Sequence, residues 1–195
     1  MVLPDLPKFI TDNYEIHDLR HASAILSKDF PLEWADIVDV LSNFRLYKEW
    51  IIKAGGRKSP IAQSIDDAFF SKGWVEKTFE TVITVDGTSR ESPTHAVDYF
   101  KNQIAIEVEW NNKNPFYDRD LNNFRMLFDL KVISVGIIIT RCDELQDIFN
   151  DLGRGSSFGA STTHMSKLLP LLNGGAGGGC PILVFGISKG LYIDE

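Results

Sequence analysis

Three acidic residues in the stretch HAVDYFKNQIAIEVEW have the spacing of a metal site: Asp98, Glu107 and Glu109. If residues 103–109 form a β-strand, successive side chains point to opposite faces, so Glu107 and Glu109 share one face. Their Cβ atoms would lie roughly 6 to 7 Å apart, near enough for both carboxylates to reach one hard cation or a water bound to it. Asp98 would approach from the neighbouring strand.

The chemistry expected of this set is metal-dependent phosphodiester hydrolysis. Mg²⁺ prefers oxygen ligands and usually takes one or two protein carboxylates together with phosphate oxygens of a substrate. Asp98 and Glu107 supply those ligands, and Glu109 is placed to orient the attacking water. Two alternatives stay open. The glutamates could lie on the solvent face of an edge strand, or act as an acid and base pair on another substrate such as a sugar, which their placement on one strand disfavours.

Helices are expected first in the N-terminal third of the chain. Apolar residues recur at helical spacing over residues 17–28 and 32–50. Ser59 and Pro60 have the residue types of an N-cap and a first-turn proline, so a third helix should begin there and end near Gly73. Later segments show the same periodicity, and helices are predicted over residues 116–130, 144–149 and 164–172.

Short segments rich in β-branched and aromatic residues are expected to be consecutive strands. They cover residues 78–86, 95–101, 103–110 and 132–140, and a final strand covers 181–187. The helix over 116–130 would cross from one strand to the next, forming a strand-helix-strand unit. His95 precedes Asp98 by three residues, so on a regular strand its side chain would point to the opposite face. It is therefore not included among the candidate catalytic residues.

Composition favours one soluble domain without a general affinity for nucleic acid. The chain has 195 residues, 20 of them basic and 27 acidic, so its formal charge of −7 creates no overall basic field. Its two cysteines lack paired spacing and no segment is apolar enough to span a membrane, which favours the reducing cytoplasm. DNA binding would depend on local basic residues, which could equally be solvated surface groups: Lys48, Lys53, Arg57, Lys58, Arg119, Arg125 and Arg154.

Five segments of the chain resemble, in order, the BglII and BstYI family of type II restriction endonucleases. They are YEIHDLRHASAILSKDFPLEWADI, SPIAQSIDDAFFSKGW, IAIEVEWNNKNPF, VGIIIT and PILVFGI, and the similarity extends over residues 14–187. The most specific part in the family is an aspartate, eight intervening residues and then Glu-x-Gln. It corresponds here to Asp98, Glu107 and Glu109. Glu109 departs from the family glutamine, although BamHI, a related enzyme, has a Glu-x-Glu pair in a similar arrangement.

The resemblance implies an α/β fold of the PD-(D/E)xK nuclease type, with helices flanking a mixed β-sheet. Residues 1–195 would form one domain, divided into an N-terminal helical part (about 14–73), a catalytic sheet core (about 78–140), and a recognition loop with the C-terminal strand (about 141–187). The implied activity is Mg²⁺-dependent cleavage of double-stranded DNA by a homodimer, at a palindrome with a GATC core. A host methyltransferase is expected as its partner. The alternative is a DNA-binding protein of the same fold that has lost cleavage.

The resemblance also implies site residues outside the acidic cluster. Glu76 is the best candidate for a further contribution to the metal site, and Lys77 is a candidate for a phosphate contact. DNA contacts are implied in the loop that directly follows the acidic strand. Asparagine can pair with adenine and lysine with guanine. A polar turn before Pro115 is the alternative explanation for this loop, which consists of Asn111, Asn112, Lys113 and Asn114.

A second polar loop is expected to contact the recognition sequence. It lies in the segment GRGSSFGASTTHM, before the helix predicted over 164–172. Serine and threonine discriminate less sharply among bases, and they also fit ordinary loop solvation or an N-cap for the helix that follows. The candidate DNA-binding residues are Arg154, Ser156, Ser157, Ser161, Thr162 and Thr163.

Overall fold

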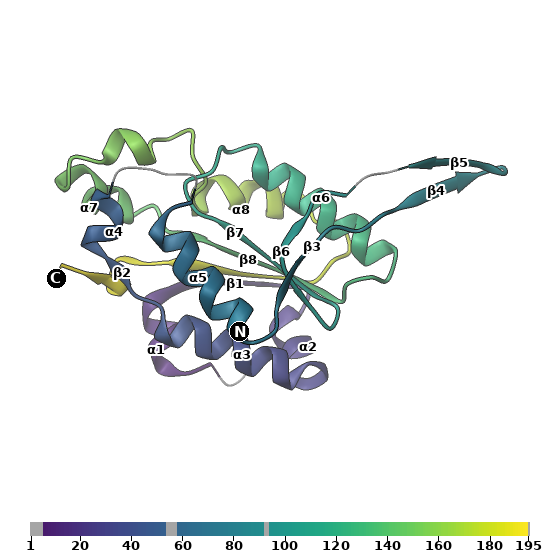
Figure 1. Ribbon diagram of the computed structural model, residues 1–195, viewed down its shortest axis with the longest axis horizontal. Helices are drawn as coiled ribbons and strands as arrows, with labels where there is room; N and C mark the ends of the chain where they lie inside the picture. The colour runs from purple at the N-terminus through teal and green to yellow at the C-terminus, as the bar shows by residue number, and fades with distance from the viewer. Residues whose placement is uncertain (1–5, 54–57, 92–93, 195) are drawn as a thin grey trace.

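A six-stranded mixed sheet forms the centre of the computed structural model, which describes residues 6–53, 58–91 and 94–194 (Figure 1). The strand order is β1 (Tyr14–Leu19), β9 (Ile182–Ile187), β8 (Val135–Arg141), β7 (Ile104–Glu109), β6 (Val97–Lys101) and β3 (Val75–Lys77). Strands β7, β8 and β9 are parallel, and the outer pairings are antiparallel. The predicted α/β class with a mixed sheet is confirmed.

Helices cover both faces of this sheet and create two apolar cores. Helices α6 (Phe116–Asp129) and α8 (Met165–Asn173) pack on one face (Figure 1). The opposite face is covered by α1 (Lys8–Asn13), α2 (Ala22–Asp29), α3 (Pro31–Asn43), α4 (Lys48–Ile52), α5 (Pro60–Ser71) and α7 (Leu145–Asp151). Within the described part of the chain, no helix is long and apolar enough to cross a membrane.

The predicted alternation along the acidic strand is confirmed in β7. Ile104, Ile106 and Val108 belong to the larger core, whereas Ala105 belongs to the core beneath α6. Glu107 and Glu109 therefore share the α6 side of the sheet. Strand β7 lies between β6 and β8, and each glutamate is only 1% exposed. The edge-strand alternative, in which both acids face solvent, is excluded.

Several predicted elements occur close to their expected bounds. The Ser59 side chain accepts a hydrogen bond from the Ala62 amide and caps α5, which has Pro60 at its first position. The helix predicted over 116–130 corresponds to α6, and those predicted over 144–149 and 164–172 correspond to α7 and α8. The last two apolar segments form β8 and β9, which are buried throughout.

The N-terminal helix predictions are partly wrong. The helix predicted over 17–28 begins only at Ala22, because residues 14–19 pair antiparallel with β9 along their whole length. Tertiary pairing here outweighs local periodicity. The helix predicted over 32–50 ends at Asn43, where Phe44 adopts an extended conformation. A short strand, β2 (Leu46–Tyr47), then pairs with β10 (Tyr192–Ile193) before α4 begins.

The strand predicted over 78–86 does not join the central sheet. Strand β4 (Val82–Val85) pairs with β5 (Thr88–Glu91) in a separate hairpin that projects from the body of the molecule (Figure 1). Asp86 and Gly87 form its turn with φ values of 49° and 80°, a combination that favours local two-residue hairpin pairing. The edge of the sheet beside β6 is instead occupied by β3, which periodicity did not indicate.

Close packing of α6 on β8 depends on a glycine. A Cβ added at Gly136 would lie 2.4 Å from the buried Phe124 ring. We expect Gly136→Ala to lower the free energy of unfolding by about 1 to 3 kcal/mol, because the core must shift to admit the methyl group. Urea denaturation measures the free energy of unfolding of the variant and of the native protein. Gly179→Ala is the control, since its Cβ would make an ordinary 3.5 Å contact with Phe128; equal stability of the two variants would contradict the prediction.

Candidate active site

The paired strands β6 and β7 bring Asp98 and Glu107 together. Tyr99 pairs with Ile106, and extending this register by one residue places Asp98 opposite Glu107. The Val108 amide donates to Asp98 Oδ2 at 2.9 Å, and the Asp98 amide donates to Glu107 Oε2 at 3.3 Å. Backbone groups of the two strands therefore hold both carboxylates, so their positions follow from the sheet itself.

Helix α6 contributes a fourth carboxylate, Asp120, which sequence reasoning missed. Asp120 is completely buried and lies on the same helical face as Tyr117, Leu121 and Phe124. Its negative charge raises the pKa of Glu109, so the two carboxyl groups lie close together. The sequence did contain a signal for Asp120. This residue lies three residues after Tyr117 in an otherwise apolar helical stripe, and a residue within such a stripe is expected to be buried with it.

His95 also lies in this cluster, so the prediction that its side chain points to the opposite face was wrong. Its Nε2 lies 3.6 Å from Glu107 Oε1 and 3.4 Å from Asp120 Oδ1. That prediction assumed a strand that begins at residue 95, but β6 begins at Val97. His95 precedes the regular strand, so strand alternation does not govern its direction. Its backbone carbonyl accepts a hydrogen bond from Asn123 Nδ2 of α6 at 3.3 Å.

Glu109 is held by groups from the following loop and from α6. Asn112 Nδ2 donates to Glu109 Oε2 at 3.0 Å, and an Arg119 guanidinium nitrogen lies 3.7 Å from Glu109 Oε1. Arg119 also donates twice to Asp120 Oδ1, at 3.0 and 2.9 Å. One partly exposed guanidinium thus contacts two buried carboxylates.

Burial dominates the electrostatics of the cluster. Desolvation raises the pKa of Asp98, Glu107, Glu109 and Asp120. Negative charge on neighbouring carboxylates, led by Asp98 for Glu107 and by Asp120 for Glu109, also raises the pKa of each glutamate, and the combined effect brings the pKa of Glu109 to about 9. Burial, followed by the Arg119 charge, lowers the pKa of His95. A divalent cation would favour the ionised carboxylates, because its positive charge would add to that of the single Arg119 guanidinium.

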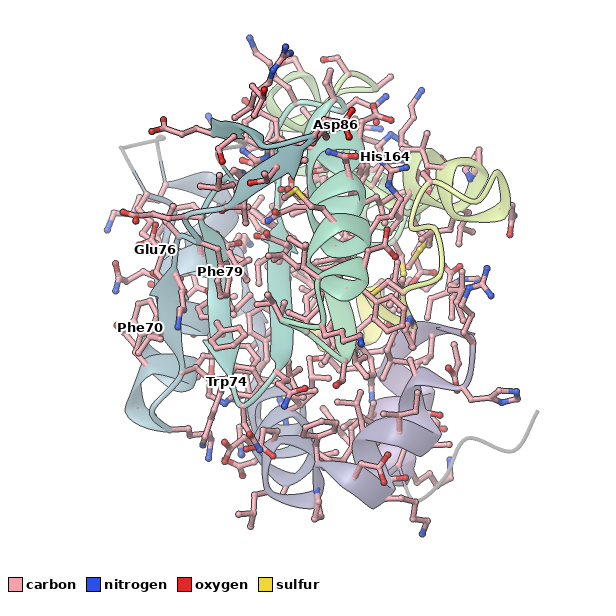
Figure 2. All side chains as sticks on the ribbon, turned by 90° about the vertical axis from the view of Figure 1, so that its right-hand side faces the viewer. Phe70, Trp74, Glu76, Phe79, Asp86 and His164 are labelled. Carbon is pink, nitrogen blue, oxygen red and sulfur yellow. The ribbon has the colours of Figure 1, made fainter. Side chains whose placement is uncertain are left out.

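A cleft opens beside these acids and carries several predicted residues on its wall. Asp98, Glu109 and Glu76 line it. Glu76 is exposed on the edge strand β3, at the outer side of the sheet (Figure 2). Lys77 points elsewhere: its Nζ lies 5.2 Å from the Phe79 ring centre and 4.9 Å from that of Phe100. This packing offers no support for a phosphate contact by Lys77.

Basic side chains from separate elements also line the cleft: Lys53, Lys58, Arg119 and Arg154. Lys58 forms an ion pair with the buried Asp66, which also accepts a 2.5 Å hydrogen bond from the Tyr99 hydroxyl. Two other predicted basic residues have partners elsewhere, since Lys48 pairs with Asp194 and Arg125 donates to Asn122. Arg57 lies outside the described residues.

The two polar loops predicted to contact DNA are joined to one another. Lys113 and Thr162 form a β-bridge, and the Thr163 amide donates to the Asn112 carbonyl at 2.9 Å. The Thr163 hydroxyl accepts from the Asn112 amide at 3.1 Å and donates to the Glu109 carbonyl at 3.2 Å. The loops therefore form one continuous wall after the carboxyl end of β7.

Candidate DNA-binding residues occupy different positions in this wall. Asn111, Asn112, Arg154 and Ser157 line the cleft. Thr163 is fully buried with its hydroxyl engaged, so the structure gives it a loop-joining role and no exposed surface for DNA. Of the remaining candidates, some are exposed and some half-buried: Lys113, Ser156, Ser161, Asn114 and Thr162.

Arg141 supports the second loop from within the protein. It is 1% exposed, and its guanidinium donates to the Phe158 carbonyl and to Thr162 Oγ1, both at 2.9 Å. We expect Arg141→Met to lower the free energy of unfolding by about 2 to 4 kcal/mol, because charged hydrogen bonds to buried acceptors are lost. Arg154→Met is the matched control and should remain as stable as the native protein in urea denaturation. Equal stability of all three proteins would show that Arg141 does not stabilise the loop.

Comparison with known proteins identifies the family. A family model described as restriction endonuclease BglII/BglIII matches residues 14–187. No curated protein matches the chain. The family match spans most of the 195 residues, including the sheet, α6 and both loops, and it confirms the resemblance expected from the sequence. The chain therefore belongs to the BglII/BglIII family of restriction endonucleases.

Proposed function

We propose that this protein is a type II restriction endonuclease that hydrolyses double-stranded DNA with Mg²⁺ as cofactor. The observation that carries the proposal is the pairing of Asp98 with Glu107 across β6 and β7, with Glu109 on the same sheet face, beside a cleft that both acidic and basic side chains line. Acidic groups and basic side chains have different tasks here. The acids suit a hard cation, whereas the basic groups suit the phosphate backbone of DNA.

The residues present fit Mg²⁺. Asp98 and Glu107 offer oxygen ligands from opposed positions on the adjacent strands β6 and β7, and oxygen is the ligand atom that Mg²⁺ prefers. When bound, Mg²⁺ would stabilise charge on the phosphate and favour formation of hydroxide from water. We assign Asp98 and Glu107 as its ligands. Glu76, across the cleft on β3, is proposed as a supporting group.

Glu109 is proposed to orient the attacking water. The Asn112 side-chain amide and the Arg119 guanidinium restrict the Glu109 carboxylate, so one face of this carboxylate remains directed toward the cleft. A fixed acceptor reduces the freedom of the water and favours attack in one direction. Because Glu109 replaces the family glutamine, it adds negative charge at this position when it is ionised, a form that a bound cation would favour. Asn112 and Arg119 offset part of that charge.

DNA contacts are proposed along both walls of the cleft. Lys53, Arg119 and Arg154 would contact phosphates, while Asn111 and Asn112 would reach base edges. Lys113, Asn114, Ser156, Ser157, Ser161 and Thr162 remain proposed contacts at the outer part of the loops. A homodimer would present two such clefts to a palindrome with a GATC core. In the cytoplasm of its host, a partner methyltransferase would protect the same site.

The proposal is tested by mapping the cut. Plasmid DNA free of methylation and containing many GATC sites is digested in Mg²⁺, and the fragment ends are sequenced. Ends that share one palindromic sequence around GATC support the whole proposal. Fragment ends that share another palindrome would support the type II nuclease assignment and refute the GATC core. Binding to DNA without cleavage would favour a protein of this fold that has lost catalysis.

Arg154 should strengthen DNA binding without affecting its sequence preference. We expect Arg154→Met to weaken binding to specific and random duplexes by similar factors, and to reduce the slope of log K against log salt by about 1. Fluorescence anisotropy in Ca²⁺ or EDTA measures both quantities. Arg125→Met, on the exposed side of α6, is the matched control. A loss confined to the specific duplex would assign base reading to Arg154 and contradict the phosphate contact.

A further inference from the structure

We infer that His95, Glu107 and Asp120 form a second metal site, which takes a divalent transition-metal ion such as Zn²⁺ or Co²⁺. One ligand atom from each residue lies within 4.8 Å of the others. The site adjoins the proposed Mg²⁺ site but uses different side chains for two of its three ligands. The inference rests on the proposed function only for the location of that Mg²⁺ site.

Each member of the trio has a buried side-chain atom without a hydrogen-bond partner among the described residues. Glu107 Oε2 accepts from the Asp98 amide, while Glu107 Oε1 has no hydrogen-bond partner among the described residues. Asp120 Oδ1 accepts from Arg119, while Asp120 Oδ2 and His95 Nε2 are likewise buried and unpartnered in the described part of the chain. Glu107 and Asp120 are 1% and 0% exposed. Buried polar atoms are normally satisfied, so three orphans in one place indicate a missing common partner.

The distances suit one ion of ordinary size. His95 Nε2 is 3.6 Å from Glu107 Oε1 and 3.4 Å from Asp120 Oδ1. Two ligands that each lie about 2.0 to 2.1 Å from a tetrahedral ion are separated by about 3.4 Å. These separations exceed good hydrogen-bond lengths and match neighbouring ligands around a metal. Small rotations of the carboxylates would complete the geometry.

The supporting contacts also resemble those of a metal site. Metal-binding carboxylates are commonly fixed by further hydrogen bonds. The Asp98 amide donates to Glu107 Oε2. Arg119 donates to Asp120 Oδ1, so rotation of the Asp120 carboxylate would be needed to turn its unpartnered Oδ2 toward the ion. Asn123 holds the His95 carbonyl against α6, one turn from Asp120. The class of metal ion follows from the ligand atoms. The imidazole nitrogen of His95 favours a transition metal, whereas Mg²⁺ prefers a site made only of oxygen atoms.

The two carboxylate oxygens of Glu107 separate this site from the proposed Mg²⁺ site. Asp98 lies on the Oε2 side of Glu107, whereas His95 and Asp120 lie on the Oε1 side. Loss of Asp98 should therefore leave transition-metal binding largely intact, and loss of His95 should not. This contrast provides a test that does not depend on cleavage.

The test is titration of the full-length, DNA-free protein with Co²⁺, followed by visible absorption, with Zn²⁺ and Mg²⁺ as competitors. We expect native protein to bind Co²⁺, excess Mg²⁺ not to displace it, and Zn²⁺ to displace it. His95→Ala should weaken Co²⁺ binding by at least about 100-fold, and Asp98→Asn by no more than about threefold. Asp120→Asn provides an independent loss of a ligand. Circular dichroism confirms that each variant is folded.

Two results would overturn the inference: unchanged Co²⁺ affinity in folded His95→Ala and Asp120→Asn, or an equal loss of affinity in Asp98→Asn. The second result would assign Co²⁺ to the Asp98 side. Cleavage in Mg²⁺ is measured separately on native protein. Co²⁺ binding without any DNA cleavage would refute the proposed nuclease and leave the transition-metal site established, so the two failures are distinguishable.

Discussion

Replacing Asp98 with asparagine should lower the rate of Mg²⁺-dependent DNA cleavage by on the order of 10³-fold. A metal ion that stabilises phosphate charge contributes several kcal/mol to the transition state, and each 1.36 kcal/mol is tenfold in rate. Asparagine keeps an oxygen that can accept from the Val108 amide, so the strand pairing should persist. The effect should therefore fall on catalysis and leave the fold unchanged.

Single-turnover cleavage at saturating protein measures this effect, because it separates the chemical step from DNA binding. Asp118→Asn is the matched control, since Asp118 is an exposed acid at the start of α6. It should cleave within about twofold of the native rate, in keeping with the small effects of most surface substitutions. Comparable rates for Asp98→Asn and native protein, with both proteins folded, would remove Asp98 from the catalytic set.

Replacing Glu107 with glutamine should strongly lower the rate of DNA cleavage while making the metal-free protein more stable. Glu107 is buried against Asp98 and Asp120, and its Oε1 lacks a partner among the described residues. A neutral amide of the same shape avoids burying charge there, so we expect a gain of about 1 kcal/mol in EDTA. For a chain of this length, that gain corresponds to about 2 to 4 °C in melting temperature. Cleavage should fall as far as in Asp98→Asn.

The stability gain of Glu107→Gln should depend on pH. Burial raises the pKa of Glu107 in the folded state, so folding favours its protonated form. This contribution is fully present below the unfolded pKa and is lost as pH rises toward the folded pKa. Native protein should therefore lose stability relative to the variant between about pH 5 and pH 8. Melting curves in EDTA at both pH values test this, and a variant that is less stable than native at pH 8 would contradict it.

The acidic site was predictable to the extent that it depends on local geometry. Strand alternation placed Glu107 and Glu109 on one face, and the segment spacing placed Asp98 on the adjacent strand. Asp120 and His95 depend on tertiary packing. Asp120 enters the site because α6 packs its apolar face on β7 and β8, and His95 because it precedes the regular part of β6.

The fold was predicted best where a segment is buried on both faces. Strands β8 and β9 read as continuous apolar runs and were found at their expected positions. Residues 17–19, at the end of β1, were mistaken for helix because their conformation depends on pairing with β9, which lies at the other end of the chain. The segment over residues 78–86, which contains β4, was assigned to the sheet because its residues have strand propensity, although the turn that follows directs β4 to pair with β5.

The most direct test of the central claim is incubation of purified native protein with methylation-free plasmid DNA in Mg²⁺ and, separately, in EDTA. We predict discrete fragments in Mg²⁺ and intact plasmid in EDTA, with Asp98→Asn giving intact plasmid in both. Folded native protein that binds the plasmid and leaves it uncut in Mg²⁺ would contradict the assignment of Asp98, Glu107 and Glu109 as a nuclease active site.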